Sequence, residues 1–232
     1  MKEVTPELLI GEWREEPERV AMAVRFAAAF ADQIKLEPAM ACLEFGCGRG
    51  NLALLLPPEL VITALDPSPE AIAALQEKLA GFERRNITAL KADFRDFPES
   101  GRYDLIYSTL ALHHIENLSQ LLHKCARLLK PGGHIALVDL DREDGSFHDD
   151  HTGIFHFGFD RGELAQELAD AGFRLRFIGD IYRREKTFAD GRRQIYPMFL
   201  AVARLDARRR SDSSCLPNRS GFQSRELDDH DL

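Results

Sequence analysis

A buried apolar run that ends in a carboxylate and three alternating glycines constrains this chain more than any other feature. Residues 43–51 read LEFGCGRGN, so the run stops at Glu44-Phe45 and the loop that follows carries Gly46, Gly48 and Gly50. Glycine lets the backbone turn sharply and come close to a bound molecule. The helix that follows such a loop has free amides at its start. The segment therefore predicts a strand that leads into a ligand-binding loop.

The neighbours of the glycines indicate which ligand the loop accepts. A dinucleotide-binding loop requires a third small residue at position 51, where this chain has Asn51. Glu44 would also place a negative charge beside a pyrophosphate. S-adenosylmethionine has no phosphate and carries a cationic sulfonium and an amino group, so a nearby carboxylate favours it.

Further strand signals follow in order, and each ends at a polar residue. The apolar segment 60–65 ends at Asp66, about twenty residues after the loop, where a carboxylate can accept both hydroxyls of a ribose. The next strand, 87–92, ends at Asp93-Phe94. Segment 103–115 reads YDLIYSTLALHHI, and segment 129–138 holds a helix stop followed by another strand.

Together these segments, over roughly residues 40–140, resemble the class I S-adenosylmethionine-dependent methyltransferases. The Glu-x-Gly-x-Gly-x-Gly loop resembles motif I of that family. The resemblance implies that Asp66 binds the ribose, that Asp93 receives the adenine amino group, and that Phe94 meets the ring. The residues that it assigns to the cofactor are Glu44, Phe45, Gly46, Cys47, Gly48, Gly50, Asn51, Asp66, Pro67, Asp93, Phe94, Ser108 and Thr109.

Two of these acids also have plain structural interpretations. Asp66 precedes Ser68-Pro69, which is a typical helix start, so it could serve only the turn. Asp93 follows a strand, where Asp is a common turn former.

The rest of the chain extends the same α/β alternation. With 44% hydrophobic residues, the 232-residue chain can bury one substantial core, which predicts a single domain over residues 1–204. Helices are expected over 17–35, 118–129 and from Asp160 to Gly172, and two last strands over 173–182 and 195–203 are expected to be joined by a charged turn near 186–193. The resemblance implies a Rossmann-like, doubly wound, seven-stranded α/β sheet, mostly parallel with the last strand antiparallel and with helices on both faces.

Charge and cysteine usage exclude some classes of partner. The net charge of −8 does not indicate a basic surface for binding nucleic acid. Small neutral or cationic substrates are more compatible with this negative charge. Four cysteines without metal-ligand spacing, together with a polar amino terminus that lacks a targeting signal, predict a reduced, cytoplasmic protein that does not enter a membrane. We expect a monomer or a homodimer, and a disordered polar tail over 205–232.

Histidines supply the candidate catalytic groups. Methyl transfer needs a general base only when the acceptor arrives protonated, and imidazole has a suitable basicity. The candidates are His113, His114, His148, His151 and His156. In the resembled family a His pair after the fourth strand more often shapes the pocket.

The segment 144–159 is interpreted as a lid insertion. It is bounded by glycines and carries aromatic residues between polar ones, which favours a mobile cover over the acceptor. Its clustered histidines and aspartates also allow a metal site. Metal-dependent small-molecule methyltransferases take ligands from strand ends, however, where this chain offers Ser108 and Thr109, so no metal is expected.

The sequence thus predicts an enzyme that transfers a methyl group from S-adenosylmethionine to a small molecule and releases S-adenosylhomocysteine. Trp13, Arg14 or Arg19, near the start of the first long helix, could meet the cofactor carboxylate or the substrate. One alternative is methylation of a protein or tRNA, supported only by the basic residues between 183 and 193. A second alternative is a non-enzymatic regulator that binds S-adenosylmethionine without turnover.

Overall fold

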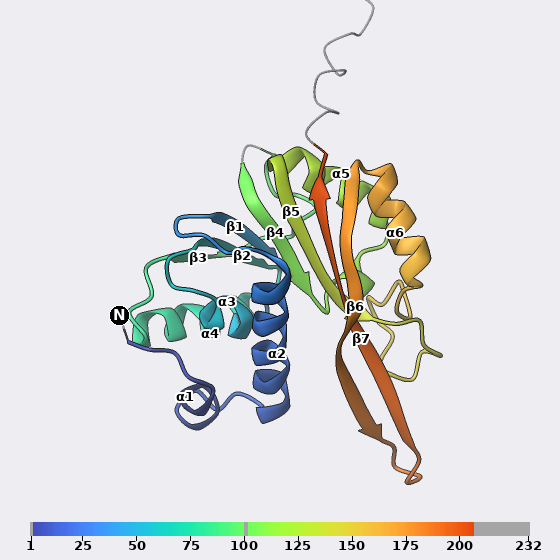
Figure 1. Cartoon of the computed structure of the whole chain (residues 1–232). Coiled ribbons are helices and arrows are strands. Elements are labelled where there is room, and N and C mark those ends of the chain that lie inside the picture. Colours follow the sequence, from blue (N-terminus) through green and yellow to red (C-terminus); the bar gives the residue numbers. More distant parts are fainter. Residues whose placement is uncertain (1, 100–101, 207–232) are drawn as a thin grey trace, which may run out of the picture.

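The computed structural model describes residues 2–99 and 102–206 as a single seven-stranded sheet with helices on both faces (Figure 1). The strands are β1 (Ala41–Phe45), β2 (Val61–Asp66), β3 (Ile87–Lys91), β4 (Tyr103–Thr109), β5 (Leu129–Leu140), β6 (Phe173–Thr187) and β7 (Arg193–Leu205). The helices are α1 (Pro6–Gly11), α2 (Pro17–Gln33), α3 (Asn51–Leu55), α4 (Pro69–Gly81), the 3-10 turn η1 (Leu112–His114), α5 (Leu118–Leu128) and α6 (Arg161–Asp170).

The strand order, β3-β2-β1-β4-β5-β7-β6, confirms the predicted fold class. The first five strands are parallel, and β7 runs antiparallel to both β5 and β6. The order reverses between β1 and β4, which pair with each other although β2 and β3 lie between them in the chain. In an open α/β sheet, ligands bind at such a switch point, outside the carboxyl ends of the strands.

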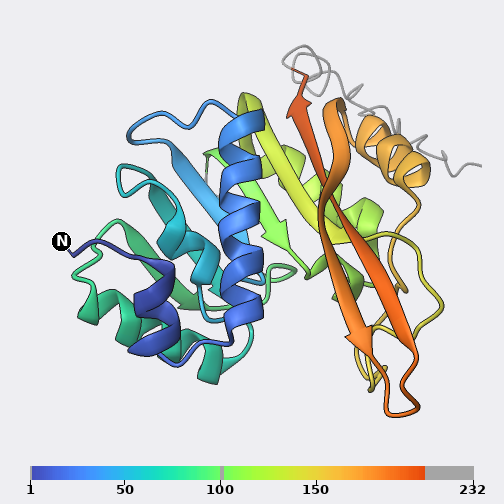
Figure 2. The same ribbon diagram turned by 60° about the horizontal axis from the view of Figure 1, so that its bottom comes forward.

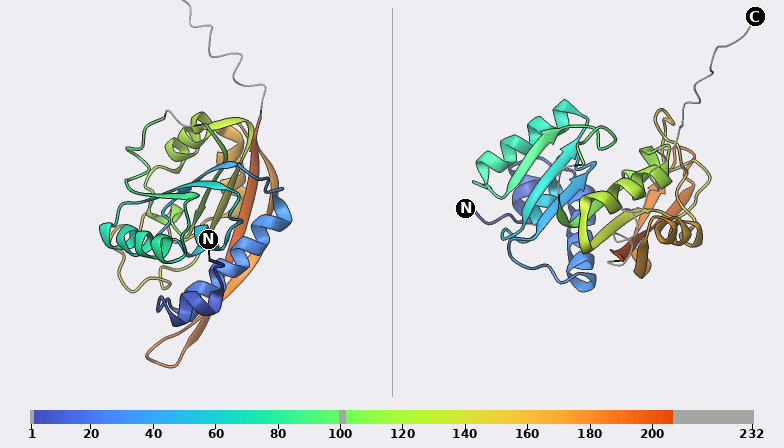
Figure 3. Two further views of the ribbon diagram at one scale, coloured as in Figure 1. Left: turned by 90° about the vertical axis from the view of Figure 1, so that its left-hand side faces the viewer. Right: turned by 90° about the horizontal axis from the view of Figure 1, so that it is seen from above.

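Two separate apolar clusters cover the two faces of the sheet, and the helices that contribute to them are seen around the sheet in Figures 2 and 3. Helices α1, α2, α3 and α4 contribute to the first cluster, which includes Phe30 and Leu75. Helices α5 and α6 contribute to the second, which includes Leu122 and Leu168. Burial of these side chains is the main favourable contribution to folding.

Helix starts follow the capping residues of the sequence. The Ser68 hydroxyl accepts the Ala71 amide at the start of α4, and the Asp160 carboxylate accepts the Gly162 and Glu163 amides at the start of α6. Helix α2 begins at the predicted Pro17 and ends at Gln33, two residues earlier than expected.

The last two strands are longer than the sequence predicted. Residues near Lys186 and Arg193 were expected to form the turn, but β6 continues to Thr187 and β7 restarts at Arg193. Some of these charges pair across the hairpin, as in the contact of 3.4 Å between Arg193 and Glu185, and others pair with neighbouring segments, so their presence does not indicate a loop. Because β7 pairs with β5 only as far as Met198, the outer part of the hairpin extends beyond the sheet (Figure 1).

This extended hairpin holds the first part of the insertion 144–159. The Lys186 ammonium donates to the Ser146 carbonyl at 2.9 Å, the Phe147 carbonyl at 3.0 Å and the Asp149 carboxylate at 2.7 Å. The Tyr196 hydroxyl lies 2.6 Å from the Ser146 hydroxyl. The insertion is therefore attached at its beginning to the hairpin.

Strand β7 ends at Leu205, which is buried, and the Asp206 amide donates to the Gly172 carbonyl. The ordered chain thus reaches the first two residues of the predicted tail, and residues 207–232 lie outside the described part. Within the described part, no helix has the length and apolar character needed to cross a bilayer.

Candidate functional site

A cavity of about 690 Å³ opens at the carboxyl ends of β1, β2, β3 and β4, where the sheet order reverses. This volume is in the range of small-molecule and cofactor sites. Loops after β1, β2 and β3 line one half of the cavity. Helix α2, the segment after β4 and the insertion line the other half.

The glycine loop after β1 has the backbone geometry that its sequence predicted. Gly46 has a φ of +67°, and a Cβ there would stand 2.4 Å from the Ala111 Cβ, so only glycine permits this close approach to the segment after β4. Gly48 has a φ of +51° and lines the cavity, with no atom within 4 Å of the place that a Cβ would occupy. The loop therefore leaves open space above its backbone for a ligand.

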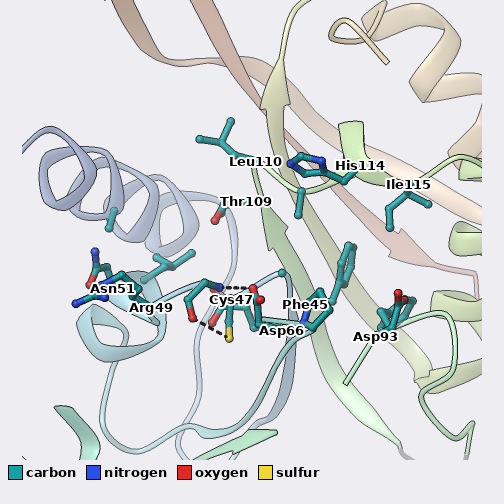
Figure 4. A pocket seen from close by; sticks show the side chains of 18 of the residues that line it. Phe45, Cys47, Arg49, Asn51, Asp66, Asp93, Thr109, Leu110, His114 and Ile115 are labelled. Carbon is teal, nitrogen blue, oxygen red and sulfur yellow. Dashed lines mark hydrogen bonds between the residues drawn. The ribbon is translucent and has the colours of Figure 1, made fainter. Parts of the chain in front are cut away.

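Asp66 joins this loop to the next one. One carboxylate oxygen accepts the Gly48 amide at 2.7 Å (Figure 4), and the other accepts the Ser68 amide at 2.9 Å. Asp66 also lines the cavity. A carboxylate has about four acceptor positions, so these two bonds leave capacity for ligand hydroxyls. The structural and the functional interpretations of Asp66 are thus compatible.

Asp93 and Phe94 line the cavity after β3. The Phe94 ring stacks on Phe45 with 4.6 Å between the ring centroids. The Asp93 carboxylate is paired with the Arg95 guanidinium at 2.6 Å, and hydrogen bonds from Arg95 hold the pKa of Asp93 below its ordinary value. Asp93 is therefore an ionised acceptor at the edge of an aromatic surface.

Glu44 is almost fully buried at the end of β1 and lines the same cavity. Burial raises its pKa to about 8, although the hydrogen bond of 3.2 Å from the Tyr107 hydroxyl opposes the shift and the nearby Asp66 adds to it. A positive charge beside Glu44 would favour its ionised form.

The raised pKa of Glu44 predicts a pH-dependent stability. Between about 4.5 and about 8, the folded protein holds a proton on Glu44 that the unfolded chain releases, so stability falls as the pH rises through this window. Relative to Glu44→Gln, the wild type should lose up to about 1.4 kcal/mol of unfolding free energy per pH unit. Urea unfolding of both proteins across the window measures this difference, and parallel curves would contradict it.

Two of the predicted cofactor residues lie outside the cavity lining. Gly50, with a φ of +75°, precedes α3, and a Cβ there would stand 2.3 Å from Leu75 of α4, so its small size serves helix packing. The Ser108 hydroxyl is buried and donates to the Phe45 carbonyl at 2.8 Å, which ties β4 to the loop after β1. The other predicted cofactor residues all line the cavity.

A buried charge network beside the glycine loop was not predicted. The carboxylate of Glu15, which is only 2% exposed, accepts hydrogen bonds from Arg49 at 2.6 Å, Lys78 at 2.9 Å and Asn51 at 3.1 Å. The Lys78 ammonium, 1% exposed, also donates to the Asn51 side chain. The network joins the segment before α2, the start of α3 and helix α4. It also explains Asn51, whose side chain is fixed by two charged partners.

The two histidines after β4 have different environments. His113 is 2% exposed, and its Nδ1 lies 2.9 Å from the buried Asp139 carboxylate. Asp139 also accepts the Leu112 amide at 3.0 Å and so fixes the turn after β4. His114 lines the cavity instead, with its Nδ1 2.9 Å from the Gly153 carbonyl.

The histidines of the insertion do not line this cavity. The His148 ring lies against His113 with 4.9 Å between the centroids, and burial together with His113 and His114 lowers its pKa to about 4. His151 donates to the Gly145 carbonyl and His156 to the Ile115 carbonyl. Of the five predicted base candidates, His114 is the one among the lining residues.

Helix α2 and the insertion complete the other half of the cavity. Of the three candidates near the start of α2, Arg19 is in the lining, whereas Trp13 packs against Phe82. Phe155 of the insertion also lines the cavity and is 49% exposed. Within residues 2–99 and 102–206, no three His, Cys, Asp or Glu side chains are grouped to hold a metal ion.

Comparison with known proteins agrees with this geometry. Residues 43–135 match a family described as a methyltransferase domain. The chain is 37% identical over 108 residues to trans-aconitate 2-methyltransferase of Mycobacterium tuberculosis, a match that covers 45% of this chain and 39% of that protein. The chain thus spans less than half the length of this relative. An uncharacterized methyltransferase of Synechocystis is 29% identical over 74% of this chain and 81% of its own length.

Solved structures share the fold at lower sequence identity. A putative methyltransferase of Bacillus halodurans matches with a TM-score of 0.65 and 16% identity, over 82% of this chain and 99% of that one. A SAM-dependent methyltransferase of Aquifex aeolicus matches with a TM-score of 0.63 and 18% identity, over 87% and 99% of the two chains. The methyltransferase-domain match, the methyltransferase relatives and the shared fold together support a class I S-adenosylmethionine-dependent methyltransferase.

Proposed function

We propose that the protein transfers the methyl group of S-adenosylmethionine to a small-molecule acceptor and releases S-adenosylhomocysteine. The observation that carries this proposal is the continuity of the cavity. Residues of the donor motifs and residues of α2, the segment after β4 and the insertion line one space of about 690 Å³. A donor and an acceptor bound together there would be held close to each other, and methyl transfer depends mainly on such positioning.

The donor half offers partners for the ribose, the adenine and the cationic end of S-adenosylmethionine. Asp66 would accept hydrogen bonds from the ribose hydroxyls, and Asp93 would accept one from the adenine amino group. Phe94, stacked on Phe45, would contact the face of the adenine. Glu44 lies beside the glycine loop, where a carboxylate favours the cationic end of the donor. S-adenosylmethionine is consumed in this reaction and is thus a substrate rather than a resident cofactor.

The network around Asn51 supports this donor over a dinucleotide. A dinucleotide loop needs a small residue at position 51 and approaches an anion with its backbone amides. In this chain Asn51 is bonded to Glu15 and Lys78, and one of the loop amides, that of Gly48, is already bonded to Asp66.

A small acceptor is supported by the cavity volume of about 690 Å³ and by the name of the trans-aconitate methyltransferase relatives. The basic hairpin, which was the support for a protein or tRNA acceptor, has largely local partners. Arg183 pairs with Asp180, Arg184 with Glu18, and Lys186 with Asp149. These cations are therefore not a free basic surface for nucleic acid.

Binding and turnover measurements test the proposal. In calorimetry, the protein should bind S-adenosylmethionine and S-adenosylhomocysteine and should not bind NAD. With labelled donor and mixtures of small phenols, amines, thiols and carboxylates, label should appear in a small-molecule product. Tighter binding of NAD would refute the donor assignment. Donor binding without any turnover would favour a regulator, and label in total protein or RNA would favour a macromolecular acceptor.

A further inference from the structure

The chemistry of the acceptor half of the cavity limits the molecules that it can hold. The donor loops account for the lining residues after β1, β2 and β3. What remains comes from α2, from the segment after β4 and from the insertion, and Figure 4 shows Leu110 and His114 on one side of the cavity with Cys47 and Asp66 on the other. The apolar side chains of this half are Met22, Ala23, Phe26, Leu110, Ala111, Ile115 and Phe155.

Each arginine that lines the cavity already has a carboxylate partner. Arg19 is 2.9 Å from Glu16, Arg49 is 2.6 Å from Glu15, and Arg95 is 2.6 Å from Asp93. No lysine is among the lining residues, all of which lie in the described part of the chain. An anionic acceptor would therefore have to share an arginine with the carboxylate that already pairs with it.

His114 is the titratable group of the acceptor half that can take a proton from the acceptor. The carbonyl of Gly153 can only accept a hydrogen bond, so Nδ1 of His114 donates to it across 2.9 Å. The neutral imidazole then has its lone pair on Nε2. The bond to Gly153 thus fixes the tautomer in which His114 can act as a base.

We propose that the acceptor is an uncharged, largely apolar molecule with one acidic hydroxyl, of the phenol or enol class, and that His114 is its general base. This inference rests on the proposed function. In the reaction, the hydroxyl proton moves to Nε2 of His114 and an oxygen electron pair forms the new bond to the methyl carbon. The carbon–sulfur bond breaks with its electron pair left on sulfur. The products are a methyl ether, S-adenosylhomocysteine and a protonated imidazole, which loses its proton to water.

The acceptor class is tested by matched acceptors and the full-length protein. With S-adenosylmethionine as donor, 2-naphthol should give the methyl ether with a kcat/KM at least about 100-fold above that of trans-aconitate, whose three carboxylates would meet only arginines that already have a carboxylate partner. Preferred methylation of trans-aconitate, or of an amine such as benzylamine, would overturn the acceptor class while leaving the methyltransferase proposal intact. Failure to bind the donor would overturn both.

The role of His114 is tested by His114→Gln. Loss of a general base should lower kcat with 2-naphthol about 100-fold or more and remove the rise in rate as the imidazole deprotonates, with donor affinity unchanged. A phenol that is already ionised at the assay pH should recover most of the rate, because it needs no base. His123→Gln on α5, whose Nδ1 bonds the Ser119 carbonyl outside this cavity, should behave as the wild type. An unaltered pH profile in His114→Gln would overturn the base assignment.

Discussion

Replacing Glu15 by Ala is expected to lower the free energy of unfolding by about 3–5 kcal/mol, the usual cost of removing one partner of a buried ion pair. The substitution leaves the ammonium of Lys78 almost fully buried without a carboxylate, since Asn51 is its other hydrogen-bond partner. Hydrogen bonds from Arg49, Lys78 and Asn51 also keep the pKa of Glu15 below its ordinary value, against the opposing and largest single effect of burial. Chemical denaturation measures the loss directly.

Two further variants distinguish the effect of breaking the buried ion pair from the effect of removing side-chain contacts. The double variant Glu15→Met, Lys78→Met removes both charges and keeps apolar volume, so it should recover most of the lost stability. Glu16→Ala is the matched control because Glu16 pairs with Arg19 at the surface, and it should cost less than about 1 kcal/mol. A single Glu15→Ala variant as stable as the control would show that the network does not support the fold.

Replacing Asp66 by Ala is expected to weaken donor binding by about 1.5–3 kcal/mol, which is the scale of charge-assisted hydrogen bonds. The change removes the acceptor proposed for the ribose hydroxyls and frees the Gly48 and Ser68 amides. Titration calorimetry with S-adenosylhomocysteine gives the affinity, and thermal unfolding shows whether the fold is kept.

Asp66→Asn isolates the role of the charge, because its side-chain oxygen can still accept one of the two amides. Asp96→Ala, after β3 and outside the cavity lining, serves as the control and should leave the affinity unchanged. If Asp66→Ala bound the donor as the wild type does, Asp66 would be a turn residue alone.

The sequence was sufficient to predict the donor side because that side is built from consecutive residues. The glycine loop, Asp66 and Asp93-Phe94 each follow a strand directly, so strand order alone brings them to one edge of the sheet. The capping residues Ser68 and Asp160 act over three or fewer positions and could be recognised for the same reason.

Contacts between distant segments could not be predicted in this way. Lys78 lies 63 residues from Glu15, and no local pattern distinguishes either from an ordinary exposed charge. The sequence also could not show that His114 lines the cavity and His113 does not. That difference depends on Asp139, which bonds His113 and comes from another strand. The hairpin was predicted too short because charged residues read as a turn, whereas Arg193 pairs with Glu185 across the hairpin and Lys186 pairs with Asp149 of the insertion.

The attachment of the insertion to the hairpin has a consequence for redesigning the enzyme. Lys186 and Tyr196 of the hairpin form hydrogen bonds with residues 146–149, whereas in the described part of the chain the donor loops form none with that stretch. The first part of the insertion therefore forms one unit with the hairpin, while its second part bonds the segment after β4 through Gly153 and His156. A chimaera that exchanges residues 144–159 without 182–198 would leave the Lys186 ammonium and the Tyr196 hydroxyl without their present hydrogen-bond partners. The two segments should therefore be exchanged together.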